Sequence, residues 1–252
     1  MSDANSAPKP LFKTFGAALL GTFIGAMLYG CICMLVYRYF REYRKDRRWF
    51  KYMVVFLLLV DTLHTTFSIH YCYYYLVARF QQPEVRASAV WSLLTANFLT
   101  VFPPFVSNMF YLSRLWKIGQ RNWLIIGGLL FLIIARLALE TANQILGYMH
   151  PVFSDFIRFH YYVKAYCSVS SVVDTLLAVF IIRKLRHASK SLVRAAKIVD
   201  VIVVYLLGAG ALTGVVCILS LFASIFLTGG LVDVTLHAIL GKLYIISVLA
   251  VT

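Results

Sequence analysis

Apolar residues dominate the chain, because 61% of its 252 residues are hydrophobic and only 13% are charged. Soluble globular proteins carry about 25% charged residues, so this composition excludes a water-soluble globular core. The net charge of +14 is typical of some nucleic-acid-binding proteins, but the mean hydropathy of +0.80 indicates an integral membrane protein instead.

Long apolar stretches recur seven times, and each predicts a membrane-spanning helix. A bilayer core of about 30 Å needs about 20 apolar residues per helix, whereas barrel strands alternate in polarity over about 9 to 11 residues. The predicted fold is therefore an all-α, polytopic bundle of seven transmembrane helices, with a polar N-terminal segment 1–13 and one domain 14–252. The first stretch is too long for a cleavable signal, so we expect it to target the chain. The predicted spans are 14–37, 52–78, 88–113, 122–148, 160–182, 199–227 and 231–252.

Basic residues concentrate in the loops after the first, third and fifth spans. Cytoplasmic loops carry the excess of Lys and Arg, so the N-terminus is predicted outside and the C-terminus in the cytoplasm. We expect these loops to contact anionic lipid or a cytoplasmic protein, and not nucleic acid. They contain Arg38, Arg41, Arg44, Lys45, Arg47, Arg48 and Lys51, then Arg114, Lys117 and Arg121, and then Arg183, Lys184, Arg186, Lys190, Arg194 and Lys197.

Small residues and prolines mark special positions in three spans. Gly21 and Gly25 are four residues apart, as are Gly210 and Gly214, and such pairs let membrane helices approach closely. Pro103 and Pro104 lie in the middle of the third span, where they remove two backbone donors and predict a kink.

Ionisable side chains lie at similar depth in several spans. Asp61, Asp174 and Lys242 fall near the midplane, where they are predicted to form a buried ion cluster, with His64 three residues after Asp61. Arg136 and Glu140 are four residues apart and are predicted to pair on one helix face. Because charges inside a membrane are costly, all six are candidates for ligand binding or proton coupling, beside a purely structural role.

A second polar group lies nearer the outer face. His70 in the second span, with Asp233 and His237 four residues apart in the last span, would converge if these two spans are neighbours. Such a set predicts, as an alternative, a zinc hydrolase of the alkaline ceramidase kind, in which the metal activates water. That kind has two histidines four apart in its last helix, where this chain has Asp233 and His237. Microbial rhodopsins have an aspartate four residues before their retinal lysine, and Ala238 at that position argues against a retinal protein.

Several short motifs follow one another along residues 50–250. They are Asp61-Thr62-Leu63-His64-Thr65, His70, Tyr73–Tyr75, Pro83, Trp91-Ser92, Phe110, Tyr111, Arg114, Val173-Asp174-Thr175, Gly210, Leu212, Thr213, Gly214, Gly241-Lys242-Leu243-Tyr244, Ser247 and Leu249. In this order they resemble a large family of uncharacterised seven-helix membrane proteins from basidiomycete fungi, a domain of unknown function. The resemblance implies a seven-helix fold and a fungal origin, and it brings no activity. In that family the last helix usually continues into a short tail, whereas this chain ends at Thr252.

These observations favour a non-enzymatic membrane protein of receptor-like topology that senses a small ligand from the outer face. The alternatives are a proton-coupled transporter or channel, which would use Asp61, Asp174 and Lys242, and an outer-facing metal-dependent hydrolase, which would use His70, Asp233 and His237. No cofactor is expected. The expected location is the plasma membrane or another membrane of the secretory pathway.

Overall fold

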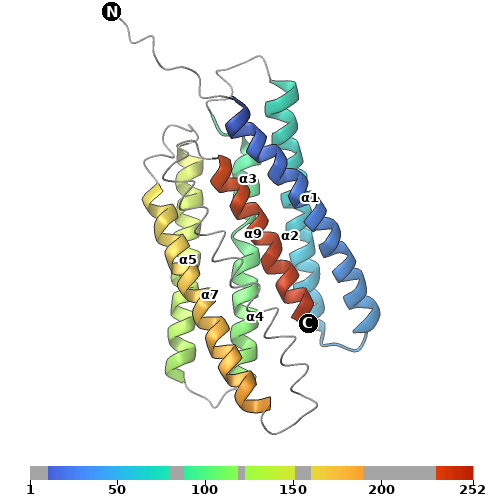
Figure 1. The fold of residues 1–252 in the computed structure, drawn as a ribbon, viewed down its shortest axis with the longest axis vertical. Coiled ribbons are helices and arrows are strands. Elements are labelled where there is room, and N and C mark those ends of the chain that lie inside the picture. Colours follow the sequence, from blue (N-terminus) through green and yellow to red (C-terminus); the bar gives the residue numbers. More distant parts are fainter. Residues whose placement is uncertain (1–10, 80–87, 119–122, 151–159, 190–230, 252) are drawn as a thin grey trace, which may run out of the picture.

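The computed structural model describes residues 11–79, 88–118, 123–150, 160–189 and 231–251. Over these ranges the chain is helical and contains no strand, which confirms the all-α class (Figure 1). The predicted sixth span, 199–227, and Gly210 and Gly214 within it lie outside the described residues. The elements are α1 (Leu11–Glu42), α2 (Arg48–Tyr73), the π-helical turn η1 (Tyr74–Ala78), α3 (Trp91–Leu99), α4 (Phe102–Ile118), α5 (Trp123–Met149), α7 (His160–Ser189) and α9 (Leu231–Val251).

Five helical segments in the described part of the chain are long and apolar enough to cross a membrane. The apolar part of α9, Val234–Ala250, is somewhat shorter. The protein is therefore an integral membrane protein with several spans. The five segments are Gly16–Glu42, Arg48–Ala78, Trp91–Trp116, Trp123–Met149 and Ala165–Arg183.

Large apolar side chains cover the outer surface of these helices. Leu124 is 92% exposed and Met27 is 74% exposed, for example. A soluble protein rarely leaves so much contiguous apolar surface in contact with water, whereas a lipid environment favours it. The exposed apolar residues also include Leu20, Phe23, Met34, Leu59, Leu63, Phe131 and Ile134.

Helix α1 is longer than the sequence predicts, because it continues to Glu42 instead of ending near residue 37. Its last turn carries the pair Arg38–Glu42, with 2.9 Å between Nε and Oε1, and this i,i+4 spacing supports the extra helical turn. The short turn to α2 is held by the Tyr39 hydroxyl, which donates to Asp46 at 2.8 Å. In Figure 1 this turn lies at the same end of the molecule as the C-terminal end of α9.

Helix α9 lies between two groups of helices. It packs on α1 and more lightly on α2 along one side, and on α4 along the other, while α5 and α7 pack on each other and on α4 (Figure 1). Gly21 and Gly25 of α1 face α9, as a close-packing pair should. A Cβ at Gly21 would collide with the Thr235 side chain, and a Cβ at Gly25 would lie 3.2 Å from Lys242 Cε. These two glycines therefore set the separation of α1 and α9.

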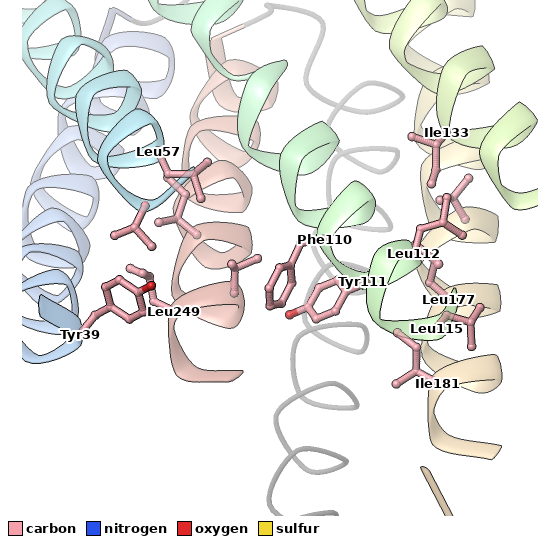
Figure 2. Close-up of a cluster of buried hydrophobic side chains, with 14 of the residues drawn as sticks. Tyr39, Leu57, Phe110, Tyr111, Leu112, Leu115, Ile133, Leu177, Ile181 and Leu249 are labelled. Atoms are coloured by element: carbon pink, nitrogen blue, oxygen red, sulfur yellow. The ribbon is translucent and has the colours of Figure 1, made fainter. Parts of the chain in front are cut away.

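The main apolar core joins α1, α2, α4, α5, α7 and α9 (Figure 2). Helix α4 contributes several consecutive side chains to this core. The rings of Phe110 and Tyr111 meet edge to face, with 5.5 Å between their centroids. In a membrane such contacts act through close packing, since lipid tails are as apolar as the core. Figure 2 labels Tyr39, Leu57, Phe110, Tyr111, Leu112, Leu115, Ile133, Leu177, Ile181 and Leu249.

The predicted third span is broken in its middle, as its two prolines predict. Helix α3 ends at Leu99 and α4 begins at Phe102, so Thr100 and Val101 form a turn between them. Pro103 and Pro104 lack the N–H groups that would bond the carbonyls of Leu99 and Thr100 in a continuous helix. In the first turn of α4 the same missing donors cost nothing.

Candidate functional site

Lys242 and Asp61 form a buried ion pair between α9 and α2. Lys242 Nζ lies 2.5 Å from Asp61 Oδ1 and 2.8 Å from the Thr65 hydroxyl oxygen. The two charged side chains are only 2% and 3% exposed. On the α1 side, the ammonium group lies 5.5 Å from the centre of the Tyr29 ring, close enough for a cation–π contact.

The sequence of α2 explains how this pair is assembled. Asp61, His64 and Thr65 are spaced i, i+3 and i+4, so they share the face of α2 that turns inward, and all three are buried. The Thr65 hydroxyl also donates to the Asp61 carbonyl at 2.8 Å, which fixes its rotamer. Gly25 leaves room for the aliphatic part of Lys242 to pass α1 on its way to Asp61.

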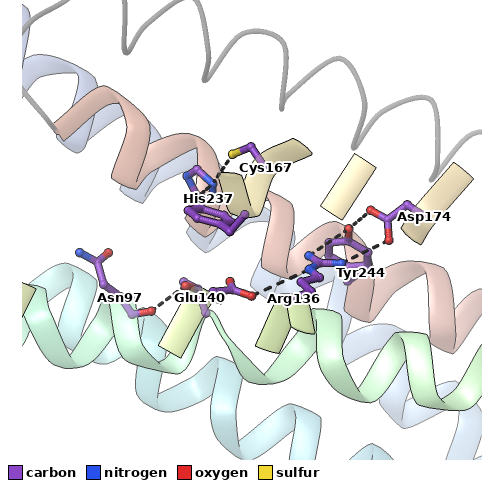
Figure 3. A network of polar contacts seen from close by, with 9 residues as sticks. Asn97, Arg136, Glu140, Cys167, Asp174, His237 and Tyr244 are labelled. Carbon is purple, nitrogen blue, oxygen red and sulfur yellow. Dashed lines mark hydrogen bonds and ion pairs between the residues drawn. The ribbon is translucent and has the colours of Figure 1, made fainter. Parts of the chain in front are cut away.

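A second polar network joins α5, α7 and α9 (Figure 3). Arg136 Nη1 donates to Asp174 Oδ1 at 3.3 Å, and the Tyr244 hydroxyl donates to the other Asp174 oxygen. Arg136 Nη2 also reaches the Tyr244 oxygen at 3.4 Å. Glu140 Oε2 lies 3.9 Å from Arg136 Nε, so the predicted i,i+4 pair is a loose ion pair. All four side chains are buried.

The structure separates the predicted ion cluster into two. Lys242 pairs with Asp61, and Asp174 pairs with Arg136 instead of Lys242. The reason is the position of α9: Lys242 and Tyr244 are two residues apart, which is about 200° around a helix, so they point to nearly opposite sides. Helix α9 thus carries one polar network on each flank.

Three small adjoining cavities surround α9 at this level, each with room for about one water molecule. One lies between α1, α2 and α9, and a second lies at the α3–α4 break; both are lined by His64 and Lys242. The third lies at the Arg136 network and shares Thr100 and Gly241 with the second. The broken helix therefore lies between the two networks.

Some buried polar atoms at these cavities have no hydrogen-bond partner within the described residues. They are Asp61 Oδ2, His64 Nδ1 and Arg136 Nε. Buried polar groups are almost always satisfied, and water or a bound ion is the usual partner when the protein supplies none. The polar atoms and the cavities beside them fit small, hydrogen-bonding occupants.

The two outer histidines lie against different neighbours. His70 is exposed and its ring lies 5.4 Å from that of Trp91. His237 bonds the Tyr166 hydroxyl and lies 3.7 Å from Cys167 Sγ, on the α7 side of α9. The side chain of Asp233 lies outside the described residues. Among the side chains that the structure describes, no group of three or more His, Cys, Asp or Glu could hold a metal ion, so the hydrolase hypothesis gains no support from His70 and His237.

Two hydroxyl-bearing residues belong to the networks although they are not among the candidate site residues that the sequence predicts. Thr65 contacts Lys242, and Tyr244 bridges Arg136 and Asp174. Threonine and tyrosine are common in membrane helices, so composition gives no signal for them. The usable signal is spacing, because Thr65 is one helical turn from Asp61 and Tyr244 is two residues from Lys242.

Comparisons with protein-family models, with curated proteins and with solved structures gave no match to this chain, so the resemblance to the fungal family stays a prediction.

Proposed function

We propose that this protein moves protons across the membrane in which it lies, with the Asp61–Lys242 pair as the central proton-exchanging site. The single observation that carries the proposal is this pair, buried between membrane-spanning helices and next to a broken helix. In this proposal the chain has seven spans, with the N-terminus outside and the basic loops in the cytoplasm against anionic lipid. The membrane is the plasma membrane or another membrane of the secretory pathway.

Ionisable groups inside a bilayer support this function. Placing a charge there costs about 2.5 to 3.5 kcal/mol on insertion scales, and intramembrane Asp, His and Lys mark proton pathways in many transport proteins. No described residue makes a hydrogen bond to the Oδ2 atom of Asp61 or to the Nδ1 atom of His64. These two atoms can exchange a proton with water in the cavities that His64 lines.

The broken helix supports it as well. Transport proteins often place their ion sites at discontinuous helices, where unwound backbone carbonyls face the ion. Here Leu99 and Thr100, whose carbonyls lose their helical donors to Pro103 and Pro104, line the same cavity as Asp61 and Lys242. Residues of the helix break and the Asp61–Lys242 pair thus line one small cavity.

The size of the three cavities that the described residues form beside α9 favours protons over a larger solute. A ligand-sensing protein of receptor-like topology needs a pocket for its ligand, and drug-sized ligands occupy about 300 to 1,000 Å³. The three cavities beside α9 each admit about one water molecule. Ligand sensing from the outer face stays a prediction.

Proton entry into liposomes tests the proposal. The full chain is reconstituted into liposomes that contain a pH-sensitive dye and potassium, and valinomycin then creates an inside-negative potential. We expect acidification well above that of protein-free liposomes, and a loss of at least about tenfold in the Asp61→Asn variant, because its amide cannot carry a proton.

The matched control is Glu42→Gln, which removes a carboxylate from the exposed Arg38–Glu42 pair. This variant should keep the wild-type rate of acidification. The proposal fails if wild-type liposomes acidify no faster than empty ones, or if Asp61→Asn retains the full rate.

A further inference from the structure

Apolar side chains lie beyond the Asp61–Lys242 pair in one direction. We call the end of the bundle that holds the α1–α2 turn the turn end (Figure 1). Toward it, Leu57 lies one helical turn from Asp61 on α2, and Ile245 lies one turn from Lys242 on α9. Both side chains are fully buried in the main apolar core, together with Ile32 of α1. Moving a charge through such a core is costly, so this flank of α9 is unfavourable for a proton on its way to the turn end.

On the opposite flank of α9, polar side chains continue toward the turn end. The Tyr111 hydroxyl of α4 bonds the Ser247 hydroxyl of α9, and both side chains are buried. Figure 2 shows the Tyr111 ring pointing from α4 toward α9. Ser247 lies one turn beyond Tyr244, and Ser107, one turn before Tyr111, donates to the Tyr244 carbonyl at 3.3 Å. We call Tyr111 and Ser247 the hydroxyl pair.

Charged groups lie on both sides of the hydroxyl pair. Asp174, which binds Arg136, is close enough to Tyr111 to interact with it electrostatically, and so is Arg114, one turn further along α4. Arg114 interacts in the same way with Asp46 in the α1–α2 turn. The hydroxyl pair therefore lies in a series of polar side chains that leads from the middle of the bundle to its turn end.

The two flanks of α9 meet at the helix break. The cavity that Asp61 and Lys242 line shares Thr100 and Gly241 with the cavity beside Arg136. Each cavity has room for about one water molecule, and water carries protons between groups that do not touch. A proton at the Asp61–Lys242 pair can thus reach the other flank without entering the apolar core.

We propose that the hydroxyl pair carries protons between the network of Arg136 and the turn end, so that the route crosses from one flank of α9 to the other. This inference rests on the proton transport proposed above. A hydroxyl group both donates and accepts a hydrogen bond, so it can take up a proton from one neighbour as it releases its own to the next. Each hydroxyl ends as it began, one proton has moved, and no further reactant is needed.

Proton entry into liposomes, driven by the same potential, tests the hydroxyl pair. Tyr111→Phe and Ser247→Ala each remove a single oxygen atom. We expect each variant to lower the rate of acidification at least about tenfold, because the series of hydrogen bonds is interrupted. The matched control is Tyr148→Phe, which removes a hydroxyl that lies 3.0 Å from Thr95 Oγ1 between α3 and α5. This control should keep the wild-type rate.

The conservative variant Ser247→Thr separates transport from structural support. It keeps the hydroxyl but adds a methyl group at a buried position, so it should melt no higher than Ser247→Ala. We nevertheless expect it to acidify liposomes close to the wild-type rate, and so about tenfold faster than Ser247→Ala. Rates that follow thermal stability across these variants would give the two hydroxyls a purely structural role and overturn the inference.

The inference and the proposed function can fail separately. If wild-type liposomes acidify and Asp61→Asn liposomes do not, while Tyr111→Phe keeps the wild-type rate, transport stands and the hydroxyl pair is not on its route. If wild-type liposomes acidify no faster than empty ones, the transport function is wrong and the role of the hydroxyl pair is refuted with it.

Discussion

Lys242 places a positive charge in the interior of the bundle, where it is only 2% exposed. Asp61 neutralises it and Thr65 accepts a further hydrogen bond from it. Breaking a buried ion pair by removing one partner is far more costly than replacing both, because the remaining charge has no compensation. The pair therefore affects stability and function at once, and mutations must separate the two effects.

The first prediction concerns this pair. Lys242→Met should lower the free energy of unfolding by about 3 to 5 kcal/mol, because it leaves Asp61 buried without its cation. Denaturation in detergent micelles, followed by circular dichroism, measures this loss. The double variant Asp61→Asn/Lys242→Met, which leaves no charge behind, should recover most of it. A Lys242→Met variant as stable as the parent would show that the pair is not buried as described.

For single residues, the sequence predicts depth along a helix but not the direction of the side chain around it. Depth along each span can be counted from the sequence, which predicts Asp61, Asp174 and Lys242 at similar depth, and all three side chains are buried in the structure. The direction of each side chain around its helix depends on which helices are neighbours, and one sequence does not supply this. Asp174 therefore pairs with Arg136 and Tyr244 instead of joining Asp61 and Lys242 in one cluster.

Among the described elements, α1 and α9 pack most extensively, and Gly21 leaves no room for a side chain beside Thr235. Its spacing to Gly25 predicts a close helix contact, but not which helix makes it. The structure shows that the partner is α9, far away in the sequence. The same limit applies to the broken span: Pro103 and Pro104 predict the break itself, whereas its position beside Lys242 follows only from packing.

The second prediction tests the α1–α9 contact. In Gly21→Ala the new methyl group would collide with Thr235, so the helices must separate, at a cost of about 1 to 3 kcal/mol in the free energy of unfolding. Gly30→Ala is the matched control, because nothing lies within 4 Å of a Cβ there. Thermal unfolding in detergent compares the two. Equal stability of both variants would refute the close contact.

At the scale of the whole molecule, composition and the lengths of the apolar stretches predict an all-α membrane protein, and the structure confirms this class. The described residues include five helices long enough to span a membrane and the shorter α9. The α1–α2 turn and the C-terminal end of α9 lie at one end of the bundle (Figure 1). That this end faces the cytoplasm stays a prediction.

The third prediction concerns this topology. The chain has no Asn-X-Ser or Asn-X-Thr sequence, so an introduced glycosylation site reports its own location. A site added before residue 10 should be glycosylated in microsomal membranes, and a site in the turn 43–47 should not. Modification of the turn site, with an unmodified N-terminal site, would reverse the proposed orientation. The readout is a mass shift that a glycosidase removes.

Proton entry into liposomes that contain the double variant Asp61→Asn/Lys242→Met is the most direct measurement, because this variant should keep its fold while it loses both charges. We predict that its rate falls at least about tenfold below that of the wild type, close to the rate of empty liposomes. A folded double variant that acidifies liposomes at the wild-type rate would contradict the proposal that protons pass through the Asp61–Lys242 pair.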